Sequence, residues 1–310
     1  MKRKIFHAVA LAVAVAPMAW WSVSAAASLS LTHVHGLTYS ADGSKLMVPS
    51  HHGLAVFSSG QWSKASGPEH DYMGFAGTRS ALYSSGHPAP GSGLKNPFGL
   101  IKSTDGGTSW KQLGLEGESD FHTMAASHGT NAVYVVNPQP NSRMRTAGIY
   151  FTMNDGLKWE RAEARGLGGR PLALAVHPTD ASTVAAATDQ GLYLSKDAGA
   201  SFEPLIAGQR ALAAAFTLDG KELWWSGFEG RPTLTALPLR DGSKPRRVVL
   251  PAMGEDAVSY IAQNPARSQE MAVATFKKSV FVSADGGGTW TRIANEGDAA
   301  AATAVSRKKD

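Results

Sequence analysis

Histidine is the residue type whose placement in this chain most directly suggests chemistry. The 310 residues include ten histidines and no cysteine. Seven of the ten lie in one stretch of the sequence, at His33, His35, His51, His52, His70, His87 and His122. Imidazole is the commonest protein ligand for transition metals, and a carboxylate such as Asp71 can complete such a site. The pattern therefore raises the hypothesis of a metal site without thiolate ligands.

The spacing of these residues limits which of them can meet. His33 and His35 are two residues apart, so in an extended strand their side chains point the same way. His51 and His52 are neighbours and would point oppositely, so we expect only one of them, His52, to join the site. Nearby methionines, Met73 and Met124, would favour Cu(I). The alternative is that the histidines hydrogen-bond loop backbones around a polar channel mouth.

A repeated segment of eight residues indicates the elements that would position the histidines. It has Ser or Thr first, Asp or Asn third, Gly fifth and an aromatic residue eighth, and its four copies begin at Ser103, Thr152, Ser195 and Ser283. These residue types suit a tight turn between two strands. The Asp accepts hydrogen bonds from turn amides, the Gly tolerates positive φ, and the aromatic ring packs in the next strand.

The spacing between the copies predicts the number of units. The starts are 49, 43 and 88 residues apart, and degenerate copies lie near Leu239–Ser243 and Phe57–Trp62. Six units of about 44 residues, each rich in short β runs, are typical of propeller blades. We therefore predict an all-β, six-bladed propeller of four-stranded antiparallel blades over residues 28–296, with blades at about 33–62, 71–113, 121–162, 171–205, 211–243 and 256–293.

The predicted blades assign each histidine to a face. In an up-and-down blade, the loop before the first strand and the turn between the second and third strands share one face. All seven histidines fall on that face, here called the histidine face, over blades 1 to 3, whereas His128 and His177 fall on the opposite face. We expect copper or zinc and no nucleotide cofactor; the predicted ligands are His33, His35, His52, His70, Asp71, His87 and His122.

The four repeated segments resemble the Asp-box (BNR) repeats of sialidase-like and sortilin-like β-propellers. The chain as a whole is similar to bacterial Asp-box proteins often labelled glycosyl hydrolase. The resemblance implies the propeller fold, with the boxes as structural turns at the blade edges. Because one fold carries many activities, function must be argued from the site.

A sialidase-type hydrolase is one alternative that the resemblance implies. It would need arginines for a substrate carboxylate, an acid, and a tyrosine nucleophile with a glutamate partner. The residues that match these roles are Arg170, Arg210, Tyr260 and Asp71, with Glu69 as another acid. The sequence departs from the family in blade 1, where His33–Leu37 replaces the arginine motif. Glu255 is the nearest glutamate in sequence to Tyr260.

A scaffold propeller that binds a protein or glycan across one face is a third possibility, and it is similar to photosystem assembly propellers. Basic residues complete the histidine face on the other blades, and such an arc could hold a carboxylate or another anion. They are Arg143, Arg145, Arg170, Arg210, Arg231, Lys277 and Lys278. Of the three possibilities, a non-catalytic metal-binding propeller accounts best for histidines on one face only.

The N-terminal segment, residues 1–27, is predicted to be a secretory signal. A basic start at Lys2–Lys4 precedes an apolar run that Pro17 interrupts and that ends in small residues. A membrane span needs ~20 apolar residues, so we expect cleavage, no remaining transmembrane span, and a periplasmic or extracellular protein. The formal charge then falls from +5 to +2, too little to argue for nucleic acid. Residues 297–310 are predicted to be a flexible tail.

Overall fold

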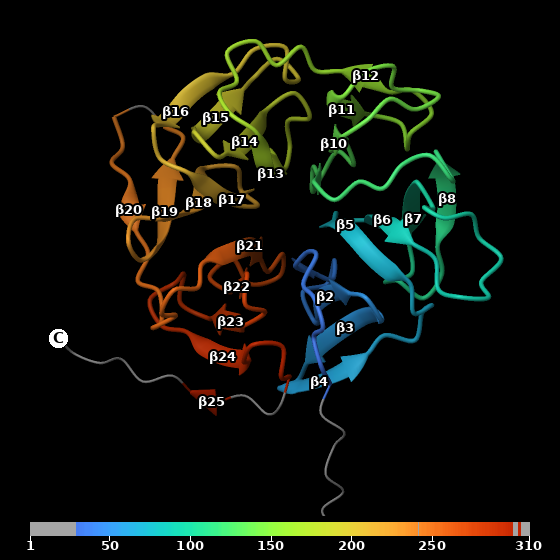
Figure 1. The fold of residues 1–310 in the computed structure, drawn as a ribbon. Coiled ribbons are helices and arrows are strands. Elements are labelled where there is room, and N and C mark those ends of the chain that lie inside the picture. Colours follow the sequence, from blue (N-terminus) through green and yellow to red (C-terminus); the bar gives the residue numbers. More distant parts are fainter. Residues whose placement is uncertain (1–28, 241, 300–302, 305–310) are drawn as a thin grey trace, which may run out of the picture.

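The computed structural model describes residues 29–240, 242–299 and 303–304, which form six small sheets around a central axis (Figure 1). Each sheet is antiparallel, with its first strand at the axis and its fourth at the rim. The predicted fold class, a six-bladed propeller of four-stranded blades, is confirmed. The described residues include no helix long and apolar enough to cross a membrane. The predicted signal lies outside them, as does most of the predicted tail.

The first three blades follow one another along the chain. Blade 1 contains β1 (Thr38–Tyr39), β2 (Leu46–Ser50), β3 (Gly53–Ser58) and β4 (Gln61–Lys64). Blade 2 contains β5 (Asp71–Gly77), β6 (Leu82–His87), β7 (Leu100–Ser103) and β8 (Lys111–Gly114). Blade 3 contains β9 (Met124–Ala126), β10 (Val133–Asn137), β11 (Gly148–Thr152) and β12 (Glu160–Arg161).

The other three blades complete the ring. Blade 4 contains β13 (Pro171–Val176), β14 (Val184–Thr188), β15 (Gly191–Ser195) and β16 (Glu203–Ala207). Blade 5 contains β17 (Ala211–Phe216), β18 (Glu222–Phe228), β19 (Pro232–Pro238) and β20 (Arg246–Arg247). Blade 6 contains β21 (Val258–Gln263), β22 (Met271–Thr275), β23 (Val280–Ser283), β24 (Thr291–Ala294) and a fifth strand, β25 (Thr303–Ala304).

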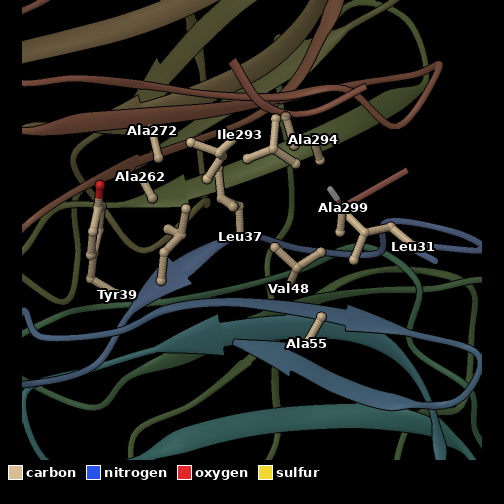
Figure 2. Close-up of a cluster of buried hydrophobic side chains, with 13 residues drawn as sticks. Leu31, Leu37, Tyr39, Val48, Ala55, Ala262, Ala272, Ile293, Ala294 and Ala299 are labelled. Atoms are coloured by element: carbon tan, nitrogen blue, oxygen red, sulfur yellow. The ribbon is translucent and has the colours of Figure 1, made fainter. Parts of the chain in front are cut away.

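The core lies between neighbouring blades. The second strands β2, β14 and β22 are buried at every position, because a blade covers each of their faces. The sequences of β14 and β22 are short runs of mostly small and β-branched residues, which suit close packing of sheet on sheet. Figure 2 shows the contact of blades 1 and 6, where Leu37 and Val48 lie opposite Ala262 and Ile293.

The four repeated segments form turns with one shared hydrogen-bond pattern. In the first copy, Ser103 Oγ accepts a hydrogen bond from Gly107 N and donates one to Asp105 Oδ1, each at 2.8 Å. Asp105 Oδ1 also accepts one from Ser109 N at 2.9 Å. The copies at Thr152, Ser195 and Ser283 repeat these contacts. Each turn joins a third strand to a fourth, on the face opposite the histidine face.

The two ends of the described chain close the ring in blade 6. Leu31 N donates to Gly297 O at 2.7 Å, and Ala299 N donates to Leu29 O at 3.0 Å. The fourth strand of this blade is β24. The N-terminal segment pairs beyond it, through the bridge between Ser30 and Asp298. The segment that leads into His33 and His35 is therefore held where the two ends of the described chain meet, here called the seam of the ring.

Candidate metal centre

Three histidines meet at one place on the histidine face. His33 and His35 come from the loop that enters β1, and His51 comes from the turn between β2 and β3. The ring centroids are 4.2 Å apart for His33 and His51, 5.1 Å for His35 and His51, and 5.4 Å for His33 and His35. One nitrogen from each lies within 4.8 Å of the others. This His33–His35–His51 triad has a donor set that suits a transition-metal ion, and its nitrogens are close enough that it could hold one.

Local sequence explains how the two loops approach. A Cβ on Gly36 would lie 2.7 Å from Phe75 Cβ and 3.2 Å from Pro49 Cγ, so the absence of a side chain lets the loop of His35 lie against blade 2. The tight turn of His51 ends at Gly53, whose φ is +93°. Glycine adopts such a positive φ without strain.

Two features of the triad suit coordination of a metal through a ring nitrogen. His51 Nδ1 lies 2.6 Å from Asp71 Oδ1, which leaves Nε2 of His51 for a metal. His35 Nε2 is buried and has no hydrogen-bond partner among the described residues. Burial, and next the neighbouring His51, lower the pKa of His35 to about 4. A carboxylate behind a ligand histidine is the usual outer-shell arrangement of metal sites.

A second histidine pair lies on the same face but is held by a carboxylate. His122 Nε2 lies 2.7 Å from Asp120 Oδ2, and His87 Nε2 lies 3.2 Å from the same oxygen. The hydrogen bond to Asp120 raises the pKa of His122. His87 Nδ1 is 2.7 Å from Asn96 Oδ1, so both its ring nitrogens have partners. Asp120 was not among the predicted site residues. The available signal was its position two residues before His122, which in an extended segment places both side chains on one side.

His70 and His52 lie apart from the triad for different reasons. His70 is 4% exposed and packs against Tyr72 and Phe98. Its Nδ1 accepts a hydrogen bond from Ala89 N at 2.9 Å, so it supports a loop of blade 2. His52 is exposed. Of the predicted ligands, the structure brings together His33 and His35 and adds His51, the neighbour of the selected His52. Asp71 touches the triad through His51 only, and His87 and His122 form the separate pair.

A cavity of about 470 Å³ follows the axis of the ring beside the triad. The first strands of the blades line it, and His35 and His122 belong to its wall. Arg170 and Arg210, each directly before a first strand, also line it, as does Tyr260. Burial raises the pKa of Tyr260 to about 12, which is opposite to the change that activates a tyrosine nucleophile.

Solved structures resemble this ring at low sequence identity. The GH74 enzyme of Niastella koreensis is 16% identical with a TM-score of 0.57, over 86% of this chain and 46% of the enzyme. A putative gluconolactonase is 13% identical with a TM-score of 0.57, over 84% and 92% of the two chains. Hydrazine synthase of Kuenenia stuttgartiensis is 14% identical with a TM-score of 0.52, over 81% and 76%. These likenesses show the propeller fold.

The comparisons go no further than the fold. No protein-family model and no curated protein matches the chain. The chain spans less than half the length of the GH74 enzyme. The case for a function therefore rests on the side chains of the histidine face.

Proposed function

We propose that this propeller binds one transition-metal ion, copper or zinc, through His33, His35 and His51, and that it does so outside the cytoplasm. The observation that carries the proposal is the meeting of three imidazole nitrogens within 4.8 Å of one another. Two separate loops supply them, so their closeness is a product of the tertiary structure. Three ligands leave at least one coordination position for water or another small ligand.

The contact between His51 and Asp71 supports this assignment. A carboxylate on Nδ1 selects the tautomer whose Nε2 carries the lone pair, and it makes that nitrogen a stronger donor. The buried, unpartnered Nε2 of His35 is a second support, because buried polar atoms usually have a partner and a bound metal would provide one.

The neighbouring histidines of one turn provide the test. The chelator-treated protein is titrated with Zn²⁺ and with Cu²⁺ against a chromophoric competitor, alongside His51→Ala and the matched control His52→Ala. We expect one ion per chain, an affinity lowered at least about 10-fold by His51→Ala, and an unchanged affinity for His52→Ala. Equal losses in the two variants, or no binding by the parent protein, would contradict the proposal; circular dichroism checks that each variant is folded.

Partner binding across the same face is the second candidate, because two large apolar side chains are exposed there. Phe228, the last residue of β18, is 42% exposed, and Phe276, directly after β22, is 59% exposed. Capture of a protein or glycan that survives loss of the triad but not Phe276→Ala would favour this role. Turnover of aryl glycosides that Tyr260→Phe abolishes would instead favour a hydrolase.

A further inference from the structure

The axial cavity has an uneven distribution of charge. Two arginines line it, Arg170 from the loop before β13 and Arg210 from the loop before β17, whereas no aspartate or glutamate of the described chain does. Neither guanidinium forms an ion pair with any residue between positions 29 and 299 that the structure describes. The remaining wall is mostly apolar, with residues such as Leu172, Leu212 and Ile261. The cavity therefore offers two cationic groups without an anion of the protein.

One member of the histidine triad borders the same cavity. His35, one of its three members, belongs to the wall, on the side of blades 1 and 2. Arg170 and Arg210 directly precede β13 and β17, the first strands of blades 4 and 5. These blades lie across the axis of the ring from blades 1 and 2 (Figure 1). A volume of about 470 Å³ lies within the range of small-molecule sites, about 300–1,000 Å³. A ligand that fills the cavity would meet both His35 and the arginines.

From this placement we infer that the cavity takes a small polycarboxylate, one carboxylate of which coordinates the metal while another pairs with Arg170 and Arg210. The inference rests on the proposed function and names the ligand of that site: the ion is held as a metal–carboxylate complex. Carboxylate oxygen is a good ligand for the position that three imidazoles leave open. Arginine binds carboxylate through two parallel hydrogen bonds.

A polycarboxylate has opposite effects on zinc binding by the protein when it acts as a free chelator and when it joins the metal in a ternary complex. This difference provides the test. The probes are Zn²⁺ and citrate. Free citrate binds zinc and would lower the apparent affinity of any protein that competes with it for the ion. If citrate instead joins the metal in the cavity, the protein keeps zinc as citrate is added, and zinc-loaded protein retains radiolabelled citrate on a desalting column.

The variants separate this inference from the metal site itself. We expect Arg170→Gln/Arg210→Gln to bind zinc alone as the parent does, but to lose zinc to citrate at a concentration at least about 10-fold lower. Arg231→Gln is the matched control, because Arg231 lies on the histidine face of blade 5 but does not line the cavity. It should behave as the parent.

Each other outcome has a definite meaning. If citrate removes zinc equally from the parent and the double variant, the polycarboxylate inference is wrong and the metal site stands. If zinc alone does not bind, the proposed function and this inference both fail. Thermal unfolding of the double variant, expected at the parent temperature, excludes a general loss of structure as the cause of any change.

Discussion

The carboxylate of Asp71 allows the metal proposal to be tested without removing a ligand. Its Oδ1 lies 2.6 Å from His51 Nδ1, close enough for the carboxylate to act on that ring. Asp71→Asn keeps an acceptor oxygen but removes the charge, whereas Asp71→Ala removes both. Loss of an outer-shell partner typically weakens metal binding by about 10- to 100-fold, or about 1.4 to 2.7 kcal/mol. We expect the loss of zinc affinity to lie near the lower limit for Asp71→Asn and near the upper limit for Asp71→Ala.

The assay is a competition titration of Zn²⁺ with a chromophoric chelator at pH 7.5, with Asp120→Asn as the control. Asp120 is also an aspartate of the histidine face in contact with histidine, but its partners are His122 and His87, outside the triad. It should leave zinc affinity unchanged. Parent affinity in Asp71→Ala, or an equal loss in Asp120→Asn, would refute the assignment of His51 as a ligand supported by Asp71.

Three further predictions concern the stability of the ring. His70 is buried and its pKa is lowered from 6.5. The folded state therefore binds fewer protons than the unfolded state, and the stability that His70 contributes above pH 6.5 decreases as the pH falls below that value. The urea midpoints measured at pH 7.5 and at pH 5 should therefore differ less in His70→Gln than in the parent. Equal differences in the two proteins would contradict this. Tyr134 Oη donates to Ala181 O at 2.7 Å between blades 3 and 4, so Tyr134→Phe should cost about 1 kcal/mol in urea unfolding, and an unchanged midpoint would count against a role for that bond. A Cβ on Gly74 would overlap a backbone carbonyl of blade 3, so Gly74→Ala should cost about 1–3 kcal/mol by thermal unfolding, and a parent-like melting temperature would show that the blades can separate there.

The fold could be predicted because the repeated turns combine a specific set of residue types with a regular spacing. Ser103 and Asp105 make hydrogen bonds through short polar side chains, and Gly107 has a positive φ of +89° that glycine adopts without strain. These contacts are local, so a short segment of sequence is sufficient to specify them. The degenerate copies near 57–62 and 239–243 also lie between third and fourth strands.

The site was less predictable because it depends on loops. The alternation of side chains along a strand predicted that His51 and His52 point oppositely and that only one of them joins the site. However, β2 ends at Ser50 and β3 begins at Gly53. Both histidines therefore belong to a tight turn, where alternation does not apply. His70 was a reasonable ligand by position, yet the fold of the following loop gives its Nδ1 a backbone partner at Ala89. Such contacts between loops depend on tertiary packing that residue spacing does not report.

The closure of the ring would give an ion bound by the triad a mechanical role. The segment that carries His33 and His35 begins at the seam, where Leu31 N meets Gly297 O. An ion shared with His51 would fasten this segment to the turn after β2. A bound ion would therefore oppose opening of the seam, and opening of the seam would weaken binding of the ion. At a free metal concentration 100 times the Kd, binding would add about 2.7 kcal/mol to the work of freeing the segment. The ion would then act as a clasp: a metal-loaded ring would resist unravelling from its N-terminal end, and a metal-free ring would begin to open there.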